Sequence, residues 1–320
     1  MERLLLVDGG GSKTEILLLK ENYEPEKYFL YGGINPFHIG LENLTHRFQK
    51  IRNSISVRLS HLVISLAGSS TLRREIERIL REVFPESRVS LLTDIEASFY
   101  AATMGADGII VSSGTGSFAY GKVENRDWRA GGWGYLFDDE GSSYWIGREA
   151  MSHFFRVMDG REEPSMLSTM LRHHLKLANL IQEFPNLYER LRNPIELAAL
   201  SKIVSKAAEE GDTKARAILR DAALHLFNLV YAVSTHIKKD EKSILEVYGI
   251  GGMLLRCEPL RAELSRLIHQ NLPNHIFTTS RNPPLMGCVV YLLQKKENRV
   301  EEKIVESILD FIRGVSYEES

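Results

Sequence analysis

Two glycine turns in the sequence combine close backbone approach with neighbouring polar side chains. The first follows Asp8 and comprises Gly9, Gly10, Gly11, Ser12, Lys13 and Thr14; the second comprises Gly114, Thr115 and Gly116. Because glycine carries no Cβ, the N–H groups of such turns can converge on phosphate oxygens. We interpret both turns as candidate phosphate-binding loops, although the first turn alone is equally compatible with an ordinary hairpin connection.

The first turn matches neither of the two common nucleotide-binding motifs. A P-loop requires glycine directly before its lysine and a helix after it, whereas Ser12 precedes Lys13 and an extended apolar run follows. The dinucleotide motif likewise opens a helix. A third glycine turn, with Gly251 and Gly252, follows a predicted strand and would let an adenine ring lie against the backbone. Together with Asp8, which could hold a magnesium ion through its waters, the three turns predict binding of ATP and Mg²⁺.

A single aspartate is placed to act in phosphoryl transfer to an alcohol, which requires a group that accepts the hydroxyl proton. Asp94 follows a predicted strand at residues 89–92 and begins a predicted helix, so it would lie at the strand end near the glycine turns. We therefore predict that Asp94 is a general base. The alternative is that Asp94 only caps the helix, because aspartate is a favoured N-cap residue.

A further cluster joins glycines, aromatic residues and carboxylates. It consists of Gly131-Gly132-Trp133-Gly134 followed by Asp138-Asp139-Glu140-Gly141-Ser142-Ser143-Tyr144-Trp145. Carboxylates accept hydrogen bonds from the hydroxyls of a polyol, and an aromatic ring offers a flat apolar face. We interpret this cluster as a sugar-binding segment. The alternative is a tight loop with core tryptophans and an aspartate that caps the following helix.

Short apolar runs flank both phosphate-binding candidates. Runs at 4–7 and 16–19 lie on either side of the first turn, and runs at 108–111 and 118–123 lie on either side of the second. Each pair predicts a glycine-turned hairpin. Because the same pattern occurs twice, we expect two structurally similar halves.

The segments between and after these hairpins predict an α/β fold. Strands at 62–66 and 89–92, separated by a helix within 71–84, form a β-α-β unit and hence a parallel sheet with helices on its faces. The stretch 144–239 is expected to be mostly helical. Its clearest helix begins after Gly211-Asp212, where the aspartate can act as the cap.

The composition restricts the class of protein. With 320 residues there is room for about two domains, and 43% hydrophobic and 26% charged residues are typical of a globular chain. A net charge of -2 gives no basic excess for nucleic acid, and the longest apolar stretch, 285–293, is about half of a membrane span. We find no targeting segment, and we expect Cys257 and Cys288 to be buried thiols. The expected protein is cytoplasmic and acts on small molecules, without nucleic-acid or membrane partners.

The motifs together resemble a known family, the N-acetylglucosamine kinases and their relatives grouped as BadF/BadG/BcrA/BcrD ATPases. The resemblance is carried, in order along the chain, by Asp8 to Thr14, Thr93-Asp94, Ser113 to Ser117, Gly131 to Gly134, Asp139 to Trp145 and Gly249 to Gly252. The fold that it implies is two ribonuclease H-like domains of the actin-like ATPase type, hinged around a cleft. We expect an N-terminal domain of residues 1–111 plus about 300–320, and a C-terminal domain of residues 112–299 with a helical insertion.

The resemblance also implies roles for individual residues. The first two turns would hold phosphates, Gly251 and Gly252 would contact adenosine, and Asp94 would be the base. Asn35 and Asp139 would hold sugar hydroxyls, with Gly132 and Trp133 near the substituent at the second sugar carbon. The implied activity is ATP-dependent phosphorylation of the 6-hydroxyl of a hexosamine or hexose, with N-acetylglucosamine as the first expectation and a homodimer as an open one.

Three alternatives remain at this point. Many N-acetylglucosamine kinases have glycine where this chain has Asp138, and related broad-specificity hexokinases share the aspartate pair, so a hexokinase or glucosamine kinase is possible. An activator of 2-hydroxyacyl-CoA dehydratases would hold an iron–sulfur cluster through cysteines near the second turn, where this chain has Ser112 and Ser113. A sugar-sensing regulator or an actin-like polymer would bind nucleotide without transferring phosphate. Repressors of the related type carry a DNA-binding segment ahead of the first turn, for which we expect no room.

Overall fold

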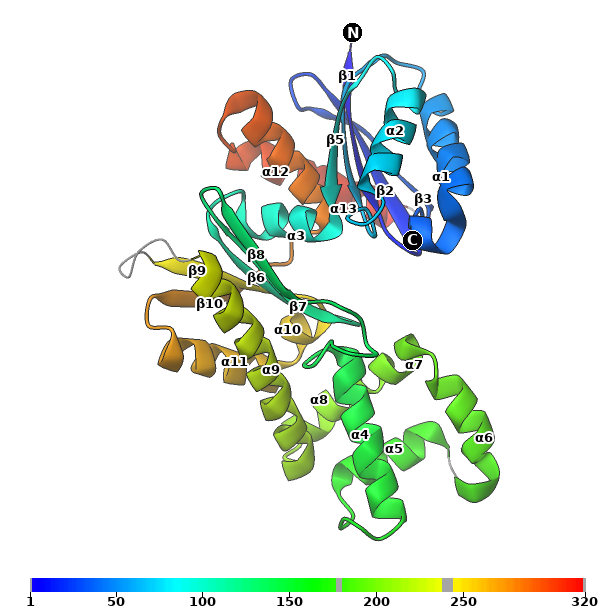
Figure 1. The fold of residues 1–320 in the computed structure, drawn as a ribbon, viewed down its shortest axis with the longest axis vertical. Coiled ribbons are helices and arrows are strands. Elements are labelled where there is room, and N and C mark those ends of the chain that lie inside the picture. The colour runs from blue at the N-terminus through cyan, green and yellow to red at the C-terminus, as the bar shows by residue number, and fades with distance from the viewer. Residues whose placement is uncertain (1, 177–179, 238–243, 319–320) are drawn as a thin grey trace. The chain divides into compact units, whose positions relative to one another are not determined.

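The structure is a computed structural model that describes residues 2–176, 180–237 and 244–318, and it divides the chain into two compact units (Figure 1). Unit 1 comprises Met1–Ala106 and Asn282–Ser320, and unit 2 comprises Asp107–Arg281. The chain returns to unit 1 at Asn282 rather than at about 300, because helix α12 (Pro284–Glu297) packs against helix α3 (Asp94–Thr103). The expected end of the helical stretch at Lys239 lies outside the described residues.

Unit 1 is built on a five-stranded sheet with the order β3-β2-β1-β4-β5. The strands are β1 (Arg3–Gly9), β2 (Lys13–Lys20), β3 (Pro25–Gly32), β4 (Leu59–Leu66) and β5 (Arg88–Thr93). Strand β1 pairs antiparallel with β2 and parallel with β4, and β4 pairs parallel with β5. The first predicted hairpin and the β-α-β unit are both confirmed.

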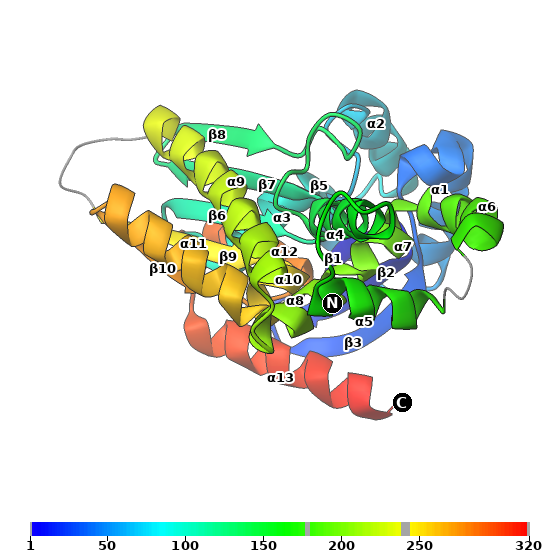
Figure 2. The same cartoon turned by 90° about the horizontal axis from the view of Figure 1, so that it is seen from below.

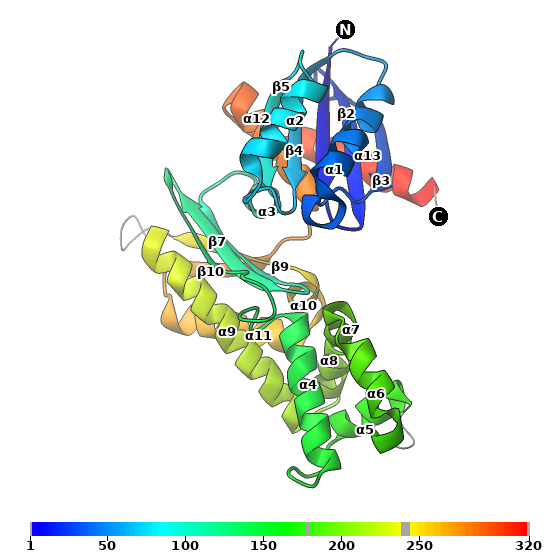
Figure 3. The same ribbon diagram turned by 45° about the vertical axis from the view of Figure 1, so that its right-hand side comes forward.

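Helices cover both faces of this sheet, as Figure 3 shows. Helices α1 (Pro36–Asn53) and α2 (Arg73–Val83) pack on the face that carries Leu5 and Val7. Helices α3, α12 and α13 (Glu302–Glu318) pack on the face that carries Leu4 and Leu6. Because both faces are covered, the central strand is apolar along its length instead of alternating.

Unit 2 repeats the topology of unit 1. Its strands are β6 (Gly108–Ser113), β7 (Ser117–Val123), β8 (Arg126–Gly131), β9 (Leu245–Ile250) and β10 (His275–Thr279). The order β10-β9-β6-β7-β8 is the order of unit 1 read from the other edge, with the first three strands antiparallel and the last two parallel to the first. This repeat confirms the expected α/β fold with two ribonuclease H-like domains.

Most helices of unit 2 lie between β8 and β9. They are α4 (Ser143–Met158), α5 (Met166–Leu175), α6 (Leu180–Leu191), α7 (Pro194–Ala199), α8 (Ser201–Glu209) and α9 (Thr213–Ile237), and β9 is followed by α10 (Gly252–Arg256) and α11 (Glu258–Asn271). Helix α9 crosses strands β6 to β8 (Figure 2). It begins where the sequence predicts, because Asp212 Oδ1 accepts a hydrogen bond from Ala215 N at 2.7 Å. Within the described ranges, we find no helix with the length and apolarity that a bilayer crossing requires.

One buried histidine makes the stability of unit 1 depend on pH. His61 on β4 is 4% exposed, and its Nε2 lies 2.9 Å from Ser90 Oγ. Burial, together with the charges of Arg88 and Lys296, lowers the pKa of His61 to about 4, and Glu21 opposes this shift only in part. The unfolded chain therefore binds a proton more readily than the folded chain between about pH 6.5 and pH 4.

We predict that His61 reduces the free energy of unfolding as the pH falls through this window. In His61→Gln the side chain cannot be protonated, so the loss of stability between pH 7.5 and pH 4.5 should be about 2–3 kcal/mol smaller than in the wild type. Urea denaturation at the two pH values measures this difference. His46→Gln, on an exposed position of α1, is the matched control and should keep the wild-type slope; an unchanged slope in His61→Gln would contradict the prediction.

Candidate functional site

The first glycine turn is held by a neighbouring backbone segment of unit 1. Gly10 N donates to Lys13 O at 3.0 Å and closes the turn. From the segment after β3, Gly33 N donates to Ser12 O at 3.1 Å and Ile34 N donates to Gly10 O at 3.0 Å. A Cβ on Gly33 would collide with the carbonyl group of Gly11. These contacts turn the carbonyls of the loop toward the protein, which favours an anion site on its outer side.

Asp8 lies at the end of β1, where strand pairing places it opposite Glu15 of β2 and Ser65 of β4. Burial raises the pKa of Asp8 to about 6; the nearby Ser65 hydroxyl and the charge of Lys13 lower it, while the charges of Glu15 and Asp94 raise it. The strand register brings the two predicted carboxylates to one edge of the sheet, because Leu66 of β4 pairs with Gly9, directly after Asp8, and with Thr93, directly before Asp94. This is the edge at which parallel strands end and at which α/β proteins commonly bind ligands.

Asp94 is the first residue of α3 and not its cap. The N-cap is Thr93, whose Oγ1 accepts from Glu96 N at 3.1 Å, while Glu96 Oε2 accepts from Thr93 N at 2.7 Å. The alternative that Asp94 only caps the helix is therefore wrong. Asp94 is exposed at the sheet edge, as a base that must meet a substrate requires.

Asn35 is the N-cap of α1, and its Oδ1 accepts from Phe37 N at 3.0 Å. The cap uses the amide oxygen, so the Nδ2 group is the part of Asn35 suited to donate to a ligand. The loop after β4 lies beside it: Ala67 N donates to Gly9 O at 3.0 Å, and Ser69 Oγ donates to Leu92 O at 3.3 Å. This loop connects the ends of β1 and β5, so Asn35 belongs to the same edge as the two carboxylates.

The second glycine turn, in unit 2, is held by the segment 139–143. Gly114 N donates to Gly116 O at 3.0 Å and closes the turn, and Ser143 N donates to Gly114 O at 2.8 Å. Ser113 Oγ donates to Gly141 O, and Ser117 Oγ donates to Glu140 O, each at 2.7 Å. The sequence predicts that the turn at 114–116 and the segment 139–143 are both binding segments, but it does not indicate that the second holds the first in place.

Asp139 makes its observed contacts with this second turn. Its Oδ1 accepts from Ser117 N at 3.0 Å, and a Cβ on Gly116 would lie 2.9 Å from each carboxylate oxygen. Asp139 is 7% exposed and has a φ of 68°. Burial raises its pKa, the Ser117 amide lowers it, and the neighbouring carboxylates of Asp138 and Glu140 raise it further. The role of Asp139 toward sugar hydroxyls stays a prediction.

The loop that contains Gly132 and Trp133 is closed by Asp138, whose Oδ2 accepts from Trp133 N at 2.9 Å. The Arg129 guanidinium lies 5.2 Å from the centroid of the Trp133 ring. Trp133 is 76% exposed, so the alternative of core tryptophans is wrong for Trp133 and right for Trp145, which is 8% exposed.

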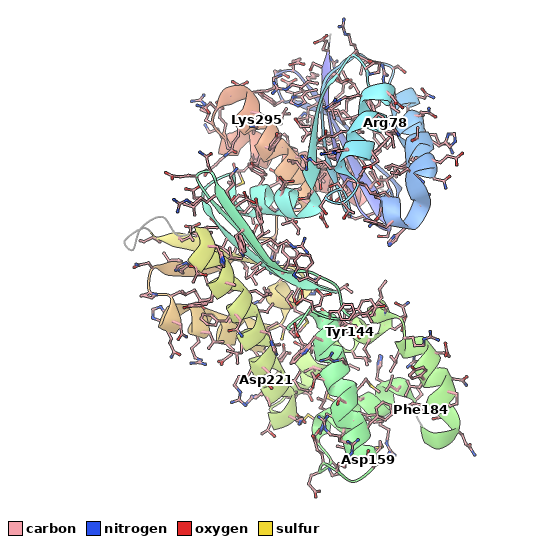
Figure 4. The ribbon with its side chains drawn as sticks, viewed as in Figure 1. Arg78, Tyr144, Asp159, Phe184, Asp221 and Lys295 are labelled. Atoms are coloured by element: carbon pink, nitrogen blue, oxygen red, sulfur yellow. The ribbon has the colours of Figure 1, made fainter. Side chains whose placement is uncertain are left out.

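The capping alternative for the same loop is also wrong. Ser142, rather than an aspartate, caps α4, because Ser142 Oγ accepts from Trp145 N at 3.1 Å. Tyr144, at the start of α4 in Figure 4, packs with its ring centroid 5.1 Å from that of Tyr135 in the loop. The loop is thus anchored at its far end by aromatic packing as well as by Asp138.

The second and third glycine turns meet within unit 2. Gly251 has a φ of 85°, and a Cβ there would lie 2.7 Å from the Ser113 carbonyl carbon and oxygen. Thr115 and Gly252 line one cavity of about 520 Å³, together with Ser143, Ile195, Ala198, Ala199, Ser201, Lys202, Ser205, Met253, Arg256 and Cys257. The size suits a nucleoside. A larger cavity, of about 660 Å³ beside α9 and α11, contains none of the predicted residues.

Several residues of these two sites escape sequence reasoning. The lining residues of α7 and α8 come from the helical insertion, where no motif marks them. His38 lies against the first turn, since a Cβ on Gly11 would be 3.1 Å from His38 Cε1; its place in the helix start after Asn35 is a signal that could have found it. The predicted residues fall into two sets, one in each unit. In the ranges that the structure describes, no three His, Cys, Asp or Glu side chains form a metal-binding group.

Both cysteines are buried, as expected. Burial raises the pKa of the Cys257 thiol and, further still, that of Cys288. A thiol with a raised pKa is a weak nucleophile and a weak metal ligand at neutral pH. The two groups therefore behave as small apolar side chains of the core.

Known proteins similar to this chain include two curated relatives. An N-acetylmuramic acid/N-acetylglucosamine kinase of Clostridium acetobutylicum is 28% identical over 301 residues, which cover 91% of this chain and 98% of the relative. An N-acetyl-D-glucosamine kinase of Dictyostelium discoideum is 25% identical over 314 residues, with the same two coverages.

Solved structures share the fold. A protein of Chromobacterium violaceum, proposed to be an N-acetylglucosamine kinase, has a TM-score of 0.70 at 24% identity and covers 92% of this chain and 99% of its own. A ROK hexokinase of Thermus thermophilus has a TM-score of 0.57 at 15% identity, with the same coverages. The model of the BadF/BadG/BcrA/BcrD ATPase family matches residues 7–289, a span that contains every residue of both sites. The chain is therefore a member of the BadF/BadG/BcrA/BcrD ATPase family.

Proposed function

We propose that the protein transfers the γ-phosphoryl group of ATP to the 6-hydroxyl of a hexosamine or hexose, with N-acetylglucosamine as the first candidate. The observation that carries this proposal is the pair of Asp8 and Asp94 at one sheet edge beside a backbone-supported glycine turn. A turn of amides for phosphate and a carboxylate for a hydroxyl proton are the two requirements of a kinase for alcohols. Membership of an ATPase family and the names of the two curated relatives support the same reaction.

We propose that the glycine turns bind the donor nucleotide, ATP, through their backbone amides. The cavity of unit 2 would take the adenosine, with Gly252 as the surface for the base and the turn at 114–116 for phosphate oxygens. The turn of unit 1 is proposed as a phosphate-binding loop through its own amides. Two cationic side chains, Lys202 and Arg256, line the same cavity and favour an anionic ligand.

Asp94 is the proposed base for the acceptor. In the phosphoryl-transfer step, a bond forms between the sugar oxygen and the γ-phosphorus, and the bond from that phosphorus to the bridging oxygen of ADP breaks. The hydroxyl proton passes to an Asp94 carboxylate oxygen. Asn35 Nδ2 would donate to a sugar hydroxyl and so orient the acceptor in unit 1.

The carboxylates of unit 1 are of the kind that Mg²⁺ prefers, and Asp8 is the residue that would hold it. One or two carboxylates are the usual protein share of such a site, the remaining ligands being waters and substrate phosphates. When bound with ATP, Mg²⁺ would neutralise negative charge on the phosphates. Asp8, with a pKa of about 6, is ionised at neutral pH and can serve as that ligand.

We propose that the loop of unit 2 closed by Asp138 determines which sugar is accepted. Arg129 and the exposed Trp133 offer a charged group and a flat ring to the substituent at the second carbon. Because Asp138 holds Trp133 through its backbone, we propose that acceptance of unsubstituted glucose or glucosamine depends on this pair. A homodimer and a cytoplasmic location stay predictions.

We predict sugar-dependent formation of ADP from ATP when the purified protein is tested with N-acetylglucosamine, glucosamine, glucose and N-acetylmuramic acid. Asp94→Asn should lower kcat by about 10²–10⁴-fold, because the base is lost while the shape of the side chain is kept. A coupled assay for ADP measures both.

The matched control is Glu75→Gln, which removes an exposed acidic group from the first turn of the neighbouring helix α2. It should retain wild-type turnover. No turnover with any of the four sugars would reject the proposed function, and wild-type activity of Asp94→Asn would reject the role of Asp94.

We predict that the ionised Asp8 side chain lowers the stability of the folded protein, although activity requires it. Its folded-state pKa is raised, so the folded chain holds the proton more tightly, and the stability that this confers is present below about pH 3.8 and is lost as the pH rises to about 6. Asp8→Asn should therefore raise the free energy of unfolding at pH 8 by about 1–2 kcal/mol and abolish turnover. Urea denaturation at pH 8 and pH 4 checks this. The gain should shrink at pH 4, and a loss of stability at pH 8 would contradict the prediction.

We also predict that Gly251→Ala weakens nucleotide binding, because a methyl group there would push the third turn away from the Ser113 carbonyl. Gly160→Ala is the matched control: Gly160 has a φ of 79°, and its Cβ position has no neighbour within 4 Å. Both variants place alanine at a positive φ, a conformation that favours glycine. Calorimetric titration with ADP should show weaker binding by at least about 10-fold for Gly251→Ala only. Equal affinities of the two variants would exclude the third turn from the nucleotide site.

A further inference from the structure

An exposed aromatic ring stands at the sheet edge of unit 1 and has no role in the function proposed so far. Phe37, in the first turn of α1, is 61% exposed. Among the described residues of unit 1, it is accompanied only by Leu30 as a large apolar side chain with high exposure. An exposed aromatic ring does not contribute the free energy that its burial would provide. At a ligand-binding edge, such a ring can instead be buried by a bound ligand.

The ring of Phe37 is held in place and does not project freely. Its Cδ2 and Cε2 atoms lie over Gly68, where a Cβ would be 2.8 and 2.9 Å away. Gly68 has a φ of 83°, a conformation that favours glycine, so the surface under the ring is bare backbone. The backbone of Phe37 is fixed as well, because its N–H donates to Asn35 Oδ1. One face or edge of the ring is thus supported by protein while most of its surface remains open.

The neighbours of Phe37 are the groups assigned to the sugar. The position of a Cβ on Gly68 is 3.4 Å from Asn35 Oδ1, so the amide, the ring and the loop are in mutual contact. The next residue of the loop, Ser69, donates to Leu92 O of β5. Only Thr93 separates Leu92 from Asp94. Phe37 therefore belongs to one continuous surface of unit 1 that runs from Asn35 to the proposed base.

We propose that Phe37 is a specificity-determining residue that stacks against the apolar C–H face of the sugar ring. A pyranose has hydroxyl groups around its rim and C–H groups on its faces, so it fits a flat ring next to a hydrogen-bond donor. Asn35 Nδ2 reaches the rim and Phe37 covers the face. The proposal rests on the proposed function, because it assumes that the acceptor is a sugar.

The ring acts on binding of the acceptor rather than on the chemical step. It carries no proton or charge for the reaction, and it would contact the sugar equally before and during transfer. Uniform binding of this kind changes KM and leaves kcat unchanged. Aromatic contacts contribute about 0.5–1.5 kcal/mol beyond area burial, and about 1.4 kcal/mol corresponds to a factor of ten.

The test compares four variants in the ADP assay with N-acetylglucosamine: Phe37→Ala, Phe37→Leu, Phe37→Tyr and Phe184→Ala. Phe37→Ala should raise the KM for the sugar by about 5- to 10-fold while kcat and the KM for ATP change less than about 2-fold. Phe37→Tyr keeps the flat ring and should restore the wild-type KM, whereas Phe37→Leu keeps apolar bulk without the ring and should not. Phe184, 43% exposed on α6 of unit 2 (Figure 4), is the control for loss of an exposed phenylalanine.

Calorimetric titration of N-acetylglucosamine into each nucleotide-free variant is a second readout that needs no turnover. It should show the same order of affinities. Wild-type affinity and KM in Phe37→Ala, or a Leu variant equal to Tyr, would overturn the stacking role while the sugar kinase activity of the wild type stands. A wild type that neither binds nor phosphorylates any of the four sugars would instead overturn the proposed function and this inference together.

Discussion

The structure depends on the close contact of one backbone segment with another at the glycine turns. In unit 1 the segment at Gly33 lies against the Gly11 carbonyl, and in unit 2 Gly251 lies against the Ser113 carbonyl. Neither place has room for a side chain. Since these contacts involve peptide groups alone, the turns are fixed by hydrogen bonds and sterics, and each unit presents amide groups without needing a ligand to organise them.

The same edge of unit 1 contains an ionised group whose partial burial is unfavourable, and the rest of the unit must offset this cost. A carboxylate is partly removed from water at Asp8, near two others of the same charge, so its ionised form is disfavoured. The sheet compensates with apolar strands that are covered on both faces by helices from the two ends of the chain. A core of this extent can tolerate local strain and repulsion at one edge, which is the usual place of such features in binding proteins.

The sequence was sufficient for the elements with strong periodicity and for the chemistry of short motifs. The hairpin at 4–19 and the helix after Asp212 were predictable because apolar runs and a cap residue identify them. Strands β3, β8 and β10 were not, since they are partly exposed edge strands with charged or mixed composition. The partner of Asp139 was also beyond reach, because its bond to Ser117 spans 22 residues and depends on tertiary packing. Thr93 and Glu96 form the capping box of α3, which identifies Thr93 rather than Asp94 as the N-cap. The sequence contains this signal, because a threonine followed three residues later by a glutamate is typical of a capping box.

The repeated strand order gives the two units an equivalent point of variation. In each unit the connection from the third strand to the fourth carries some of the proposed site residues: Asn35 and Phe37 at the start of α1 after β3 in unit 1, and the loop and helices α4 to α9 after β8 in unit 2. In unit 1 this crossover is a single helix, and in unit 2 it contains six helices among the residues that the structure describes. Both crossovers start beside a glycine turn that is fixed by the sheet. Because each crossover belongs to a single unit, its length and its side chains can change without altering the strand order of the other unit.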